Sequence, residues 1–324
     1  MEITIHIGWH KTGSTALQEF LLRNRDELAR RHRTWYPSEG LVVCAHHTIA
    51  WTFGGRTASP WGPVPVVVGG GDAYVRAAVA SARAAGCTRV VISSEEFCAL
   101  DHAAIRRLEA SLRALSDRVR IVAYVRRQDL IAESAYNMEV KWWATRVREE
   151  FDEYVRARKD EPDYARALGA WADAFGVDGL VVRPYDRGSL DGGDVRADFC
   201  RSAGVGAEGL HFADARANES LGPTTLETMR VLNNLDIANA VHEHIAARLL
   251  AYDAARRSPR CVLFEPDQRR AFLARFEASN AHLHAYGIDP AVLTLGAGTL
   301  PARNVRKLTP EEFAAMFTYL ATPA

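Results

Sequence analysis

The stretch from Ile3 to Phe20, ITIHIGWHKTGSTALQEF, decides both the expected fold and the expected site. Isoleucine alternates with threonine and histidine from Ile3 to Ile7, which predicts a short strand. Gly8 ends this strand, and a turn rich in glycine, lysine and hydroxyl side chains follows. Apolar side chains then recur at helical spacing, so we expect a helix to begin near Ser14 or Thr15.

A strand, a tight turn and a helix N-terminus together can hold an anion, because the free amides point outward and the helix dipole favours negative charge. Gly13 lets the backbone come close to a ligand, and Lys11 adds a mobile positive charge. Further hydroxyl donors are Thr12, Ser14 and Thr15. We therefore expect a phosphate-binding loop. The alternative is an incidental strand–turn–helix with a surface lysine.

The order of residues in this loop differs from the Walker A pattern, which ends in Gly-Lys-Ser/Thr. Gly8 and Gly13 have the glycine spacing of that pattern, but Lys11 lies between them and Ser14 follows Gly13 directly. This arrangement resembles the 5′-phosphosulfate loop of sulfotransferases that use 3′-phosphoadenosine 5′-phosphosulfate (PAPS). In that family Lys-Thr-Gly-Ser/Thr-Thr follows a strand.

A second motif follows the stretch Val119–Val125, which is apolar except for Arg120 and predicts a buried strand. Arg126 leaves this strand, and Ser134 lies in the next predicted helix, eight residues or about two turns after Arg126. Both side chains are then expected at the carboxyl edge of the sheet, where a guanidinium fork suits a phosphate. Sulfotransferases carry an Arg and a Ser at this spacing, and the resemblance implies that the pair binds the 3′-phosphate of PAPS. The alternative is an Arg and a Ser that merely share one helix face.

Further segments are similar to bacterial sulfotransferase-like proteins, so the resemblance spans nearly the whole chain. In one of them the resemblance implies that Tyr185 approaches the adenosine. The tail departs from the animal cytosolic enzymes, and no cofactor role is expected for Arg303, Arg306 or Lys307. The similar segments are Ile92–Phe97, Val182–Arg187, Asn218–Leu221 and Asn304–Glu312.

The order of predicted elements is strand–helix units first and helices later. Buried strands are predicted near 89–93, 119–125 and 179–185, with helices between them. This predicts an α/β fold: a P-loop NTPase-like parallel sheet flanked by helices, with a helical C-terminal cap region. We expect one sulfotransferase-like domain over 1–324, in which about 215–300 is mainly helical and caps the acceptor side. Residues 54–71, rich in Gly and Pro, are expected to form a long loop, either a lid or disordered.

Composition narrows the function classes. The chain has 324 residues, of which 48% are hydrophobic and 25% charged, as in an ordinary soluble globular protein. Lys and Arg number 40 and so do Asp and Glu, so nothing favours nucleic acid as a partner. The five cysteines are widely spaced, which favours a reduced, cytoplasmic protein over a disulfide scaffold or zinc site. We expect no signal segment and no membrane span.

The expected chemistry is in-line transfer through a loose transition state with charge building on the leaving oxygen. Lys11 and the amides of Gly13–Thr15 are expected to stabilise that charge, so no metal is expected. An acceptor hydroxyl or amine needs a base. The candidates, in order, are Glu95 at the end of a strand, Glu96, and His10 beside Lys11. Glu95 has the alternative of being only a first-turn acid of a helix.

The expected function is transfer of the sulfuryl group of PAPS to a small-molecule or saccharide acceptor, leaving 3′-phosphoadenosine 5′-phosphate (PAP). One alternative is a magnesium-dependent nucleotide kinase, for which Thr12 and Glu95 would have to be the Mg²⁺ ligands. Another is a non-catalytic nucleotide-binding protein. The sequence does not identify the acceptor. Tryptophans that could stack on a sugar or aromatic acceptor, or simply pack in the interior, are Trp51, Trp61, Trp142 and Trp143.

Overall fold

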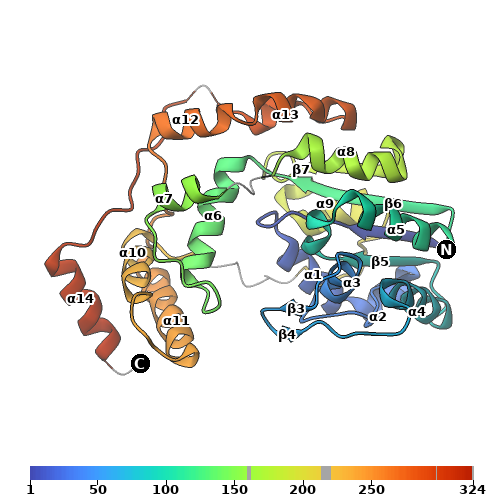
Figure 1. Ribbon diagram of the computed structural model, residues 1–324, viewed down its shortest axis with the longest axis horizontal. Coiled ribbons are helices and arrows are strands. Elements are labelled where there is room, and N and C mark those ends of the chain that lie inside the picture. The colour runs from blue at the N-terminus through green and yellow to red at the C-terminus, as the bar shows by residue number, and fades with distance from the viewer. Residues whose placement is uncertain (159–161, 213–219, 297, 323–324) are drawn as a thin grey trace. The chain divides into compact units, whose positions relative to one another are not determined.

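The computed structural model describes residues 1–158, 162–212, 220–296 and 298–322, and the chain forms two compact units (Figure 1). The single domain expected over 1–324 stays a prediction. Of the sulfotransferase-like stretch Asn218–Leu221, the first two residues lie outside the described residues. The first unit comprises Met1–Arg126, Asp163–Ala217 and Ala278–Leu293, and the second comprises Arg127–Pro162, Asn218–Glu277 and Thr294–Ala324.

The first unit is built on a five-stranded parallel sheet with the order β2-β5-β1-β6-β7. The central strand pairs on both sides, with Ile5 opposite Ile92 on one neighbour and Ile121 on the other. All three isoleucines are fully buried, as a sheet covered on both faces requires. The parallel sheet predicted from the sequence is therefore confirmed. The strands are β1 (Glu2–His6), β2 (Thr34–Trp35), β5 (Arg89–Ser93), β6 (Arg118–Val125) and β7 (Leu180–Pro184).

Helices cover both faces of this sheet. Val122 and Tyr124 of β6 pack in one cluster with apolar side chains of α1, α2 and α9. Successive side chains of a strand point to opposite faces, so Ile121 and Ala123, which are also buried, face the other side. The helices that contact β6 there are α5 and α8. The helices of this unit are α1 (Ser14–Arg23), α2 (Arg25–His32), α3 (His47–Phe53), α4 (Gly70–Ala84), α5 (His102–Arg113), α8 (Tyr164–Phe175) and α9 (Val195–Ser202).

The helix that begins at Ser14 ends at Arg23, and α2 starts at Arg25; the side-chain amide of Asn24 between them donates to the Phe20 carbonyl at 2.9 Å. One sequence expectation needs correction in this unit. The stretch 54–71 is not one long loop. It contains the two-stranded hairpin of β3 (Ala58–Ser59) and β4 (Gly62–Pro63) and the first residues of α4.

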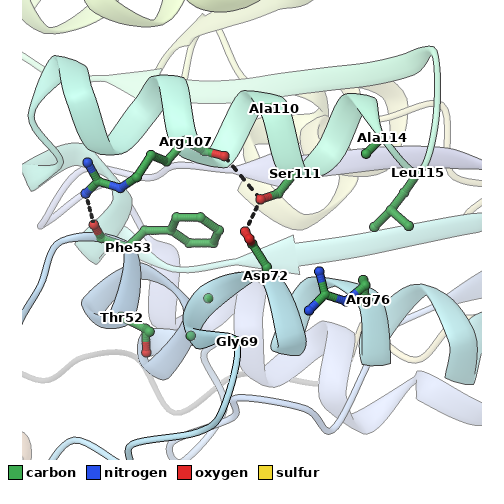
Figure 2. A pocket seen from close by; sticks show the side chains of 12 residues that line it. Thr52, Phe53, Gly69, Asp72, Arg76, Arg107, Ala110, Ser111, Ala114 and Leu115 are labelled. Atoms are coloured by element: carbon green, nitrogen blue, oxygen red, sulfur yellow. Dashed lines mark hydrogen bonds between the residues drawn. The ribbon is translucent and has the colours of Figure 1, made fainter.

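A cavity of about 580 Å³ lies among α3, α4 and α5 of the first unit (Figure 2). Asp72 of α4 accepts a hydrogen bond from Ser111 of α5, and Arg107 donates to the Phe53 carbonyl at 2.8 Å. These bonds tie the three helices together around the cavity. None of the site residues predicted from the sequence lines it. Its lining residues are Thr52, Phe53, Gly69, Gly70, Gly71, Asp72, Arg76, Arg107, Ala110, Ser111, Ala114 and Leu115.

The regular elements in the described part of the second unit are helices, and the mainly helical acceptor-side cap predicted for about 215–300 stays a prediction. Its core is rich in aromatic rings, among them Tyr136, Phe151 and Phe264. Thr309 caps α14 in a capping box with Glu312. No described helix has both the length and the apolar character needed to cross a membrane. The helices of this unit are α6 (Gln128–Lys141), α7 (Phe151–Ala157), α10 (Pro223–Leu232), α11 (Asn239–Arg256), α12 (Pro266–Ala274) and α14 (Pro310–Ala321). After α12 the chain enters α13 (Glu277–Ala281), which belongs to the first unit from Ala278 on.

Short 3₁₀ turns connect several of these elements. They are η1 (Glu95–Ala99), η2 (Val177–Gly179), η3 (Asp191–Gly193), η4 (His282–Tyr286) and η5 (Pro290–Leu293).

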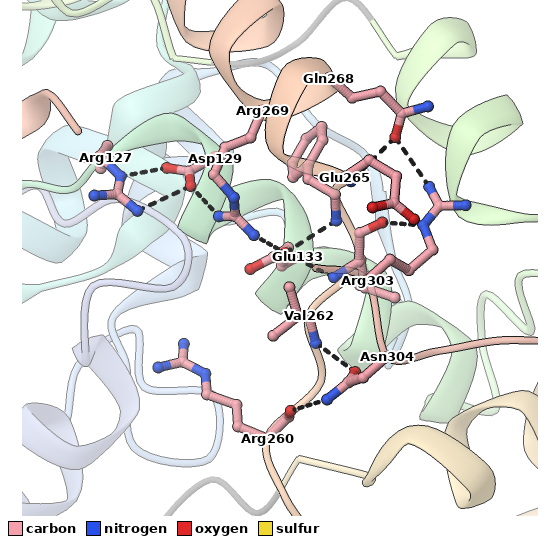
Figure 3. Close-up of polar contacts among 12 residues, drawn as sticks. Arg127, Asp129, Glu133, Arg260, Val262, Glu265, Gln268, Arg269, Arg303 and Asn304 are labelled. Atoms are coloured by element: carbon pink, nitrogen blue, oxygen red, sulfur yellow. Dashed lines mark hydrogen bonds and ion pairs between the residues drawn. The ribbon is translucent and has the colours of Figure 1, made fainter. Parts of the chain in front are cut away.

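A buried ion network holds α6 against α12 in the second unit (Figure 3). The Arg269 guanidinium pairs with Asp129 and, at 2.6 Å, with Glu133. Arg127 pairs with the other side of Asp129 at 2.6 Å, and the Leu263 amide donates to Glu133 at 2.8 Å. The side chains of Arg269, Asp129 and Glu133 are at most 8% exposed, so each charge depends on its partners for stabilisation.

Arg269→Leu should destabilise the protein by roughly 3–5 kcal/mol, because it leaves two buried carboxylates short of a partner. The matched control is Arg270→Leu on the same helix; the Arg270 side chain is 58% exposed and pairs with exposed Asp267. That control should change stability by less than about 1 kcal/mol. Denaturant unfolding of the three proteins measures both values, and equal stabilities for the two variants would contradict the role given to the network.

Candidate functional site

The candidate site residues of the first unit follow the carboxyl ends of neighbouring strands. Glu95 follows β5, the Gly8–Gly13 loop follows β1, Arg126 follows β6 and Tyr185 follows β7. Because these strands are parallel and adjacent, the four segments meet at one edge of the sheet. The strand order reverses at β1, which is where open α/β sheets bind their ligands.

The loop after β1 has an unusual backbone. Lys11 has a φ of 68° and Gly13 a φ of 78°, both in the left-handed region that only glycine enters freely. Thr12 fixes this shape: its buried hydroxyl donates to the Trp9 carbonyl at 2.7 Å and accepts from the Trp9 amide at 3.2 Å. The Ser14 hydroxyl also donates to the Trp9 carbonyl, at 3.4 Å. Two of the hydroxyls expected at a phosphate therefore serve the loop itself.

Gly13 also makes room for Tyr185. A Cβ atom on Gly13 would lie 2.7 Å from Cε2 of the tyrosine ring, closer than any side chain tolerates. Gly13 is the N-cap of α1, gives it no side-chain hydrogen bond, and is followed by a first turn without acidic residues. Exposed Thr15 lies in that turn. Such a helix N-terminus is suited to an anion, and phosphate binding by this loop stays a prediction.

Arg126 braces the loop. Its guanidinium donates to the Lys11 carbonyl at 2.6 Å and lies 5.5 Å from the centre of the Tyr185 ring. Its main chain is held in turn by the Tyr164 hydroxyl, which accepts from the Arg126 amide at 2.8 Å and donates to its carbonyl at 2.6 Å. The Tyr164 ring packs edge-on against Trp9. Lys11 and Arg126 thus bring two positive side chains to one loop.

Ser134, the predicted partner of Arg126, is half-buried on α6 and belongs to the second unit. The joint binding of one phosphate by Arg126 and Ser134 stays a prediction.

Glu95 lies directly against the loop. A Cβ on Gly8 would sit 3.1 Å from the Glu95 Cα atom, so the missing side chain at Gly8 permits this approach. The Gln18 amide, on α1, donates to the Glu95 carboxylate at 2.8 Å and to the Ser93 hydroxyl at 3.3 Å. Ser93 in turn bonds the fully buried His6 ring at 2.7 Å. Glu95 therefore ends a polar chain that runs through the buried side of α1.

The candidate bases differ in their surroundings. Burial alone would raise the pKa of Glu95, but the charge of His47 and the hydrogen bond from Gln18 outweigh it and hold the pKa below its usual value. Burial lowers the pKa of His47. Glu96 turns instead to Arg56, at 2.6 Å. His10 is exposed and lies close enough to Glu95 to interact with it electrostatically.

Sequence reasoning missed Gln18, Tyr164 and the role of Trp9. Gln18 left a signal, because it is a polar residue next to Leu17 on the apolar side of a predicted helix, and it is only 1% exposed. Tyr164 left none, since it meets Arg126 only through the fold. Among the described residues no group of three or more His, Cys, Asp or Glu side chains could hold a metal ion. The expectation that no metal is needed stays a prediction.

Comparisons with known proteins give limited guidance. No protein-family model matches the chain. An uncharacterised protein of Archaeoglobus fulgidus is 32% identical over 197 residues, which cover 60% of this chain and 52% of that protein. The chain thus spans about half the length of this curated relative. A sulfotransferase crystal structure from Alicyclobacillus acidocaldarius is 15% identical, with a TM-score of 0.43 over 75% of this chain and 98% of that one. A TM-score of this size is too low to establish a shared fold.

Gln18→Met should raise the pKa of Glu95, because it removes the donor to the carboxylate while keeping the length of the side chain. An NMR titration of ¹³C-labelled glutamate carboxylates measures this directly. Glu19→Gln, on the same helix, is the control and should not raise the pKa. An unchanged pKa in Gln18→Met would mean that the hydrogen bond does not hold Glu95 ionised.

Proposed function

We propose that the protein is a sulfotransferase that uses PAPS and modifies a hydroxyl or amine of a small-molecule or saccharide acceptor. The observation that carries the proposal is the loop after β1: Lys11 and Gly13 in left-handed conformation, ahead of a helix whose first turn has no capping side chain. This combination suits a phosphate group, and its residue order is the one that resembles the 5′-phosphosulfate loop.

The donor set fits a nucleotide with phosphates at two positions. The α1 amides and Lys11 are suited to the 5′-phosphate side. Arg126 is suited to the 3′-phosphate, because a guanidinium has several N–H donors and can bind a phosphate while it holds the Lys11 carbonyl. Tyr185, packed beside Gly13 and Arg126, offers a ring face for the adenine. Ser134 completes this set by its sequence spacing alone.

When bound, PAPS supplies the sulfuryl group, and groups of this chain neutralise charge and take up the acceptor proton. Lys11 and the amides of Gly13, Ser14 and Thr15 neutralise charge on the phosphate oxygens. Glu95, kept ionised, takes the proton of the acceptor hydroxyl or amine. Gln18 orients Glu95 and sits on the same helix whose N-terminus faces the phosphate. Glu96 is less suited to be the base because it pairs with Arg56.

The kinase alternative is disfavoured by Thr12. A magnesium-dependent kinase would need the Thr12 hydroxyl as a metal ligand. That side chain is fully buried and its hydroxyl donates to the Trp9 carbonyl. The non-catalytic alternative differs from the proposal only in turnover, so an activity measurement separates the two.

Lys11→Ala should lower turnover by about 10²–10³-fold, because it removes the positive charge from the phosphate. The turnover is measured as the conversion of PAPS to PAP, monitored by mass spectrometry in the presence of a pool of sugars, phenols and amines as acceptors. The control is Lys307→Ala, a lysine whose side chain is 81% exposed and pairs with Glu150; it should match the unmodified protein.

In the same assay Glu95→Gln should lower turnover. The affinity of this variant for PAP should stay nearly constant. Full activity in Glu95→Gln would move the base to another residue. Full activity in Lys11→Ala would overturn the assignment of the loop, and no turnover in the unmodified protein would favour the non-catalytic alternative.

A further inference from the structure

Three near-parallel rings lie beside the candidate base in the first unit. The His47 ring stacks on Trp51 with centroids 5.2 Å apart and on Trp61 at 6.0 Å, and the two tryptophans lie 6.1 Å apart. His47 and Trp51 are buried, at 8% and 2% exposed, whereas Trp61 is 53% exposed. We call these three rings the Trp61 platform.

Hydrogen bonds hold the segments that carry the platform. His47 and Trp51 belong to α3, and the His47 Nδ1 atom bonds the Ser94 hydroxyl at 2.8 Å. Trp61 sits in the β3–β4 turn, where its amide donates to the Ser59 hydroxyl at 3.2 Å. An indole fixed in this way loses little conformational entropy when a ligand stacks on it.

Charged groups border the platform. The Arg56 guanidinium lies 5.7 Å from the centre of the Trp51 ring and pairs with Glu96 at 2.6 Å. Glu96 directly follows Glu95, and both carboxylates act electrostatically on His47. A flat aromatic face thus adjoins an Arg–Glu pair next to the residue assigned as base.

This combination suits a sugar better than a phenol. A sugar ring offers C–H groups to an aromatic face and hydroxyl groups around its edge, which the Arg56–Glu96 pair can hydrogen-bond. A phenol would bring an apolar ring edge against the same charged pair and desolvate it without replacing its hydrogen bonds.

We propose that the Trp61 platform is the acceptor subsite and that it binds a saccharide, stacked on the Trp61 indole and hydrogen-bonded to Arg56 and Glu96. Naming this ligand as the acceptor rests on the proposed sulfotransferase function; the binding of a sugar at the platform does not.

The test uses the full chain and four probes: chitobiose, cellobiose, maltose and p-nitrophenol. Saturation-transfer NMR and a titration measure binding to the unmodified protein and to Trp61→Ala, Trp61→Phe and Arg56→Ala. At least one disaccharide should bind, about tenfold or more weakly to Trp61→Ala and nearly unchanged to Trp61→Phe. Arg56→Ala should also weaken it. Trp143→Ala, a part-buried tryptophan of the second unit, is the matched control and should bind like the unmodified protein.

Calorimetry with PAP on the same variants separates the two proposals. Tight PAP binding without any Trp61-dependent disaccharide binding overturns the subsite but leaves the sulfotransferase function standing. Trp61-dependent binding of p-nitrophenol alone also overturns the saccharide assignment. Trp61-dependent disaccharide binding without PAP binding supports the sugar site and contradicts the sulfotransferase function.

Discussion

The hydrogen bond from the Arg126 guanidinium to the Lys11 carbonyl joins the end of β6 to the loop after β1. The loop needs such a brace, because Lys11 occupies a left-handed conformation that is unfavourable for a residue with a Cβ atom. Thr12 closes the loop from inside and Tyr185 packs on Gly13 from the next strand. The shape of the proposed anion site thus depends on neighbouring strands as well as on the loop sequence.

Helix α1 couples the proposed anion site to the candidate base. Its N-terminus lies at the loop after β1, and Gln18, a little over one turn later, donates to Glu95. Gly8 removes the side chain that would separate Glu95 from the loop. Because one helix carries both functions, a displacement of α1 would change the anion site and the position of the carboxylate together.

The larger features of the fold could be read from the sequence because they depend on long, regular patterns. The strands β1, β5, β6 and β7 are rich in buried apolar residues, and the loop after β1 has a recognisable order of residues. Short elements could not be predicted from the sequence. Almost every residue of α3 is buried, so the helix has no exposed face and no amphipathic period. The break at Asn24 depends on a side-chain hydrogen bond, and Tyr164 reaches Arg126 only in the folded chain.

The central claim is that the loop and Arg126 bind a nucleotide phosphorylated at both the 5′ and 3′ positions. Calorimetric titration with PAP, ADP and ATP, each with and without Mg²⁺, tests it most directly. The account predicts micromolar or tighter binding of PAP, indifferent to Mg²⁺, and much weaker binding of ADP. Preference for ATP with Mg²⁺, or equal binding of PAP and ADP, would contradict the role given to Arg126 and Ser134.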